Sequence, residues 1–135
     1  MIRAVLDSNI YISGILFGGK PAQILRLART GAYQLLVSQP LQTEVARVLR
    51  EKFAWPEDRL AEALDLYWPS ANIVDADVRV QACIDPNDDR VLECAVSGGA
   101  SVIVTGDHHL LDMTSFRGAE MLTATEFLSQ LGIED

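Results

Sequence analysis

Two kinds of hydrophobic pattern alternate along the chain. Short, nearly continuous apolar runs are bounded by polar residues, and longer stretches carry apolar residues at every third or fourth position. The first pattern is typical of buried strands and the second of amphipathic helices. The short runs are residues 2–7, 33–37 and 101–105, and the longer stretches are residues 8–17, 21–31, 39–51, 57–67 and 88–96.

Weaker signals add the remaining elements. Residues 71–74 are expected to form a short third strand, residues 108–112 a short helix and residues 121–122 a last edge strand. The sequence Thr123-Ala124-Thr125-Glu126 is a capping box that begins a closing helix. Strands that alternate with helices predict an α/β fold, a three-layer α/β/α domain around a central, mainly parallel sheet of about four to five strands.

The composition narrows the class of protein. The chain has 135 residues, of which 49% are apolar, so we expect one domain over residues 1–135 with a sizeable core. No apolar run approaches a membrane span and no export leader is visible, so a cytoplasmic protein with no membrane contact is expected. Cys83 and Cys94 fit no metal-binding pattern and are expected as free thiols. The net charge of −8 argues against a broad basic face for nucleic acid, but not against an enzyme that reaches phosphates through cations.

Two acidic residues follow predicted strands. Asp7 comes directly after the first apolar run, and Asp107 follows Val104-Thr105-Gly106. Because the carboxyl ends of parallel strands meet at one edge of a sheet, both carboxylates are expected there. Each residue also has a simpler interpretation, since Asp is common at helix caps and in turns.

Further acids lie on two predicted helices. Glu44 falls on the apolar face of its helix, where a lone carboxylate is costly, so it needs either a metal ion or a salt bridge to Arg47 or Arg50. The stretch Asp85–Asp89 holds more acids than one helix start requires. We expect Asp88 to act mainly as a cap and Asp89 to point over the sheet edge.

Oxygen ligands of this kind suit Mg²⁺ or Mn²⁺ rather than zinc or copper. A carboxylate cluster that holds such an ion with a bound water is common in enzymes that cleave phosphodiesters. The sequence therefore predicts a divalent metal site.

The four acidic motifs together resemble the PIN domain family. The matching stretches are Asp7-Ser8-Asn9, Ser38 to Glu44, Asp85 to Asp89, and Thr105-Gly106-Asp107, which span nearly the whole chain. More narrowly, they are similar to the VapC-like group of toxins from toxin–antitoxin pairs. The resemblance implies a Mg²⁺- or Mn²⁺-dependent endoribonuclease that cleaves single-stranded RNA. It also implies a homodimer and a small antitoxin protein that occupies the active-site groove.

The resemblance also implies roles for individual residues. The catalytic and metal-binding acids would be Asp7, Glu44, Asp89 and Asp107, with Asp88 as the alternative to Asp89. The supporting polar residues would be Asn9, Ser38 and Thr105. Apart from the resemblance, Lys20, Arg47 and His108 are candidate substrate contacts, although ordinary surface charge is the simpler interpretation of Lys20 and Arg47. The pair His108-His109 could also bind a softer metal, although a solvated helix start is the simpler interpretation.

Two other functions remain open from the sequence. A PIN-like module could bind RNA or protein without catalysis, and the acidic composition leaves that alternative in place. A phosphohydrolase with an aspartyl nucleophile would carry a second carboxylate two residues after Asp7, where this chain has Asn9. A nucleotide-binding Rossmann domain is excluded because no glycine-rich phosphate loop follows the first strand.

Overall fold

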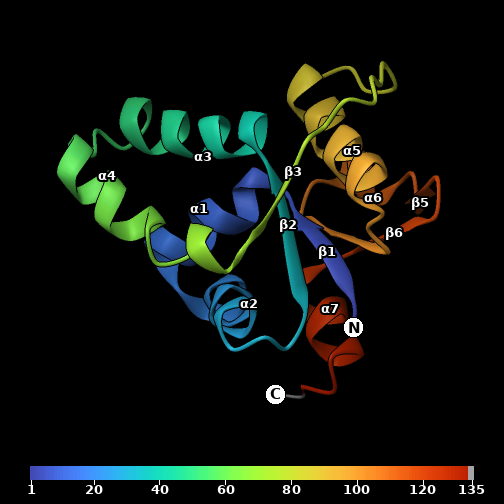
Figure 1. The fold of residues 1–135 in the computed structure, drawn as a ribbon, viewed down its shortest axis with the longest axis horizontal. Coiled ribbons are helices and arrows are strands. Elements are labelled where there is room, and N and C mark those ends of the chain that lie inside the picture. Colours follow the sequence, from blue (N-terminus) through green and yellow to red (C-terminus); the bar gives the residue numbers. More distant parts are fainter. Residues whose placement is uncertain (134–135) are drawn as a thin grey trace.

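A six-stranded sheet forms the centre of the molecule, with strand order β3-β2-β1-β4-β6-β5 (Figure 1). The computed structural model describes residues 1–133. The strands are β1 (Arg3–Leu6), β2 (Gln34–Ser38), β3 (Asn72–Val74), β4 (Val102–Val104), β5 (Ser115–Phe116) and β6 (Ala119–Leu122). All neighbouring strands are parallel except β5 and β6.

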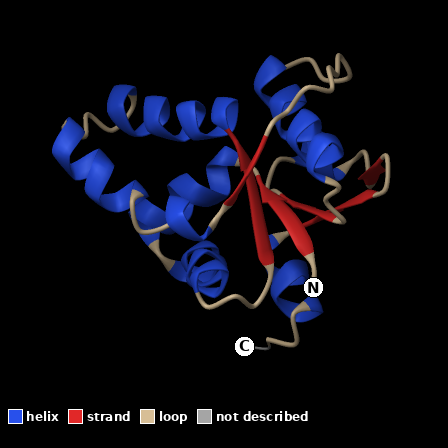
Figure 2. Ribbon diagram, viewed as in Figure 1, coloured by secondary structure: helices blue, strands red, loops and turns tan. Residues whose placement is uncertain are grey.

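The helices cover both faces of this sheet (Figure 2). They are α1 (Ser8–Phe17), α2 (Gly19–Arg29), α3 (Gln39–Glu51), α4 (Glu57–Leu64), α5 (Pro86–Gly98), α6 (His108–Leu111) and α7 (Ala124–Gln130), with a 3₁₀ turn at Trp68–Ser70. None of the helices between residues 1 and 133 is long and apolar enough to cross a membrane.

The alternation of side chains along β1 divides the core in two. Ala4 and Leu6 pack with the apolar faces of α1, α2 and α7, whereas Val5 packs with α5 and α6 on the opposite face. The central strands are buried on both faces, which explains why they appear in the sequence as continuous apolar runs. The predicted three-layer arrangement and the mainly parallel sheet are confirmed.

The number of strands is larger than predicted. Strand β5 has two residues and pairs antiparallel with β6, so residues 121–122 do not form the edge of the sheet. Arg117 and Gly118 both have positive φ between these strands, as a tight hairpin turn requires. A two-residue strand leaves no apolar pattern, which is why the sequence did not predict it.

Helix α5 begins at Pro86, earlier than the expected start near Asp88. Asp85 is the N-cap, and its carboxylate accepts a hydrogen bond from the backbone N–H of Asn87 at 2.9 Å. Asp88 and Asp89 therefore lie inside the first turn of α5 and face different surroundings. One smaller prediction is also corrected, because α2 begins at Gly19 rather than at residue 21.

Candidate active site

Asp7 lies at the carboxyl end of β1 with only 4% of its surface exposed. Its backbone N–H donates to the carbonyl of Val104 at 2.9 Å, which continues the pairing of β1 with β4. Although Asp7 occupies the N-cap position of α1, its carboxylate makes no capping hydrogen bond. Its Oδ2 instead accepts a hydrogen bond from the Thr105 hydroxyl at 2.9 Å. The carboxylate is thus directed across the sheet edge towards β4.

Thr105 joins Asp7 to Asp107. The fully buried Thr105 hydroxyl donates to Asp7 and accepts a hydrogen bond from the backbone N–H of Asp107 at 3.0 Å. Asp107 also caps α6, since its Oδ1 accepts a hydrogen bond from the His109 N–H at 2.9 Å. The two strand ends therefore deliver two carboxylates to one place, and the capping interpretation of Asp107 holds alongside this.

Asp88 completes a cluster with these two acids. Asp88 has 8% of its surface exposed. The pKa of its carboxyl group is raised to about 6, mainly by burial and then by the negative charges of Asp107 and Asp7. His109 acts in the opposite direction and lowers the pKa of Asp88. Burial also raises the pKa of Asp7, and Asp107 adds to the increase, whereas the hydrogen bond from Thr105 opposes it. Asp7, Asp88 and Asp107 thus interact as one group, which we call the acidic cluster.

Two members of the acidic cluster, Asp88 and Asp107, line a cavity of about 440 Å³. Its lining includes Cys83, Asp85, Asp88, Asp107 and His109. No local pattern predicted that Cys83 and its segment belong to the site, because they reach the cavity only through the folding of the long connection between β3 and α5.

Asp89 has different surroundings from its neighbour Asp88. Its Oδ1 accepts hydrogen bonds from the backbone N–H groups of Ala82 at 3.0 Å and Cys83 at 2.9 Å. Burial opposes ionisation of Asp89, but these donors lower its pKa below the usual range. The arrangement favours Asp88 over Asp89 as the acid that faces Asp7, since Asp89 holds the preceding segment in place.

Glu44 forms a two-contact ion pair with Arg47 on the same helix, at 2.8 and 3.1 Å. Arg47 also contacts Glu51 at 2.8 Å. The salt bridge, which the sequence left open as the alternative for Glu44, is therefore present. The structure does not place Glu44 among the main charges that act on Asp7 or Asp88.

The other predicted site residues are spread around this edge of the sheet. Ser38 is fully buried where β2 passes into α3, and Asn9 is exposed in the first turn of α1. Lys20 donates a hydrogen bond to the Thr125 hydroxyl at 3.0 Å. His108 is exposed beside His109, with 4.2 Å between the ring centroids.

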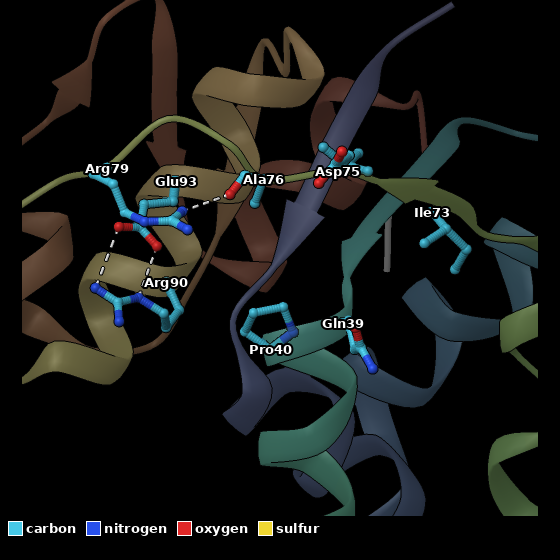
Figure 3. Close-up of a pocket in the computed structure, with 9 residues that line it drawn as sticks. Gln39, Pro40, Ile73, Asp75, Ala76, Arg79, Arg90 and Glu93 are labelled. Carbon is cyan, nitrogen blue, oxygen red and sulfur yellow. Dashed lines mark hydrogen bonds and ion pairs between the residues drawn. The ribbon is translucent and has the colours of Figure 1, made fainter.

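A second cavity, of about 590 Å³, lies between the start of α3, the segment after β3 and helix α5 (Figure 3). Glu93 is buried beside it and forms an ion pair with Arg90 at 2.7 Å. Arg79 donates to the carbonyl of Ala76 at 2.8 Å. The buried carboxylate of Glu93 already has Arg90 as a cationic partner. This cavity is therefore a weaker candidate for a metal centre than the acidic cluster.

The acidic cluster fits a divalent cation. Its donors are carboxylate oxygens, which Mg²⁺ and Mn²⁺ prefer. Raised pKa values at Asp7 and Asp88 show that these groups lack sufficient positive charge nearby to offset their burial. A bound cation would supply that charge and favour the ionised form of both carboxylates.

Comparisons with known proteins agree with this fold. A sequence profile of the PIN domain matches residues 3–109, which is most of the chain, so the protein belongs to the PIN domain family. PIN domains are typically nucleases and generally use divalent metals, in keeping with the acidic cluster. No curated protein sequence matches the chain significantly.

Two solved structures share the fold. One is a chain from the structure of VapBC2 from Rickettsia felis, which was solved bound to a DNA fragment from the VapBC2 promoter. The TM-score is 0.67 and the sequence identity is 14%, and the match covers 90% of this chain and 98% of that chain. The other is a chain from DNA-bound VapBC of Salmonella typhimurium, with a TM-score of 0.65, 18% identity, and 92% and 99% covered. At these identities the similarity shows the fold alone.

Proposed function

We propose that the protein is a Mg²⁺- or Mn²⁺-dependent endoribonuclease that cleaves single-stranded RNA. The observation that carries the proposal is the grouping of three acids at the carboxyl edge of a PIN-fold sheet. Asp88 and Asp107 line one cavity there, and Asp7 interacts with both of them. A bound divalent ion in such a site lowers the pKa of a water molecule and stabilises charge on the leaving oxygen.

The chain's own residues hold the site in position. Thr105 holds the carboxylate of Asp7 and the backbone at Asp107 through one hydroxyl group. Asp89 fixes the segment that forms one wall of the cavity. Glu44 is proposed as a further acid of the centre, and it would join when its ion pair with Arg47 opens.

We further propose that the protein is the toxin of a toxin–antitoxin pair and acts in the cytoplasm. Support comes from the two structural neighbours, which were solved as VapBC complexes. A small antitoxin protein would then bind the chain, and the active unit would be a homodimer. Lys20, Arg47 and His108 are proposed to contact the RNA substrate near the cavity.

The first experiment measures cleavage of a labelled single-stranded RNA with Mn²⁺, with Mg²⁺ and with EDTA. The parent should cleave only with metal, and Asp7→Asn should lose at least ~100-fold of the rate, a loss of about 2.7 kcal/mol in transition-state stabilisation. The matched control is Asp65→Asn, an exposed acid at the end of α4, which should cleave like the parent. Equal cleavage by Asp7→Asn and the parent would refute the proposal.

A non-catalytic module that binds RNA or protein is the second candidate. The observation that favours it is the pairing of Glu44 with Arg47, which withholds one expected acid from the cluster. Calorimetric titration with Mn²⁺ separates the two functions. A module without catalysis would bind RNA but show no divalent site that depends on Asp7, whereas the nuclease should show one.

A further inference from the structure

The start of α6 carries a set of donor atoms unlike the acidic cluster. The side chains of Asp107, His108 and His109 each offer a ligand atom, and these atoms lie within 4.8 Å of one another. The two imidazole rings lie side by side, with their planes inclined at 36°. This set combines two nitrogen donors with one oxygen donor.

The chemistry of the set differs from that of a magnesium site. Imidazole is a ligand for Zn²⁺, Co²⁺ and Ni²⁺, whereas Mg²⁺ prefers oxygen donors alone. In a tetrahedral zinc site with bonds near 2.0–2.1 Å, neighbouring ligand atoms lie roughly 3.3 Å apart. Both histidines are exposed, so small rotations of their side chains can close the remaining gap. Asp107 is held by its own cap contact and fixes one corner of the set.

The set also adjoins the acidic cluster. Asp107 belongs to both groups, and His109 lines the same cavity as Asp88. The charge of His109 acts on Asp88, which places this imidazole close to the cluster. An ion held by the histidines would therefore lie beside any ion held by the carboxylates.

We propose that Asp107, His108 and His109 form a second metal site that binds Zn²⁺ or a similar borderline ion. This ion shares Asp107 with the acidic cluster and lies at the wall of the cavity. Occupancy of the second site therefore weakens binding of Mg²⁺ or Mn²⁺ and narrows the path of the substrate. The binding itself stands on the donor set, whereas the resulting inhibition rests on the proposed nuclease function.

Binding is tested with Zn²⁺ by calorimetry and with Co²⁺ by its visible absorption. The variants are the double substitution His108→Gln/His109→Gln, with Asp7→Asn and Cys83→Ser as matched controls. The parent and both controls should show a Zn²⁺ site of similar affinity, and binding at this site should weaken on the order of 100-fold in the double variant. Circular dichroism melts confirm that each variant is folded.

Two outcomes would overturn the site. The first is a double variant that binds Zn²⁺ as tightly as the parent. The second is loss of Zn²⁺ binding in Cys83→Ser alone, which would move the site to the thiol that lines the same cavity.

The inhibition is tested by measuring RNA cleavage in Mn²⁺ with increasing Zn²⁺, with each variant compared with its own rate without Zn²⁺. Zn²⁺ should inhibit the parent at concentrations near its measured affinity, and the double variant should resist at least ~10-fold higher concentrations. Equal sensitivity in both would refute inhibition through the histidine site. If the parent shows no cleavage at all, the proposed nuclease function fails, while the Co²⁺ spectrum still decides the metal site.

Discussion

The first turn of α5 holds two neighbouring buried carboxylates whose pKa values are shifted in opposite directions. Asp88 faces Asp7 and Asp107, and its pKa is raised to about 6. Asp89 receives two backbone N–H groups, and its pKa is lowered. Their exposed fractions, 8% and 5%, are almost the same. Burial of an acid therefore does not by itself identify a site, whereas a buried acid without enough compensating charge does.

The same contrast extends along the helix. Glu93 lies further along α5, is 3% exposed, and is used by Arg90 and by the Val80 N–H at 2.9 Å. The Asp89 and Glu93 carboxylates thus hold the connection between β3 and α5. The Asp88 carboxylate is left to interact with other acids. Helix α5 therefore carries two acids that anchor the preceding segment, Asp89 and Glu93, and one acid, Asp88, that is suited to binding a cation.

The largest expected effect separates Asp88 from Asp89 in catalysis. Asp88→Asn should lower the rate of metal-dependent RNA cleavage by ~100-fold or more while the protein stays folded. Asp89→Asn should instead lower stability by about 1.5–3 kcal/mol, because two hydrogen bonds to a charged acceptor are weakened. Rates measured at a temperature where both variants are folded decide the comparison, and a larger loss in Asp89→Asn would reverse the assignment.

An effect of similar size is expected from the metal on stability. Mn²⁺ at 100 times its dissociation constant should add about 2.7 kcal/mol to the free energy of unfolding. The increase in melting temperature should disappear in Asp7→Asn and persist in Asp89→Asn. A parent protein that shows no shift with Mn²⁺ or Mg²⁺ would contradict a carboxylate metal site.

The pH dependence of the metal-free protein should also distinguish the two acids. The raised pKa of Asp88 means that the folded state binds its proton more tightly than the unfolded state does, so stability falls as pH rises from about 4 to about 6. The change should be on the order of 1–2 kcal/mol, since one pKa unit corresponds to about 1.4 kcal/mol. Asp88→Asn should remove this decrease. Denaturant melts at both pH values measure it, and an unchanged slope in Asp88→Asn would assign the effect elsewhere.

A moderate effect is expected at Thr105. Thr105→Val keeps the shape of the side chain but removes the hydroxyl that joins Asp7 to Asp107. Loss of such an orienting contact should weaken Mn²⁺ binding by about 10-fold or more. Thr105→Ser restores the hydroxyl and should regain most of the affinity, so failure of this rescue would indicate a packing effect instead.

The smallest effect is expected at Glu44. Because its carboxylate is paired with Arg47, Glu44→Gln should change Mn²⁺ affinity in the absence of RNA by less than about threefold. Glu51→Gln, which removes the other partner of Arg47, is the matched control. A much larger loss in Glu44→Gln would show that the ion pair opens when the metal binds.

The sequence predicted the parts of the fold that depend on local patterns. The runs around β1 and β4 gave their strands because both faces are buried, and Thr123 and Glu126 form the expected capping box. Strand β5 was missed because its two residues form a strand only through pairing with β6.

The candidate site was predictable only in part. The sequence places Asp7 and Asp107 after strands, and the register of β1 with β4 then brings these strand ends together. The orientations of Asp88 and Asp89 depend on where α5 begins and on how the segment around Ala82, which precedes α5 in the chain, folds back against that helix. This folding back is a tertiary feature, and no local pattern encodes it.

The connection between β3 and α5 is tied to the helix that follows it. Val80, Ala82 and Cys83 donate their backbone N–H groups to side chains of α5 only 6–13 residues further along the chain. Contacts over such short separations close small loops, which costs little entropy and favours rapid formation. Helix α5 and this connection are therefore expected to open and close as one cooperative unit, with similar hydrogen-exchange rates at the three amides. One wall of the cavity would then be lost or regained in a single local unfolding event.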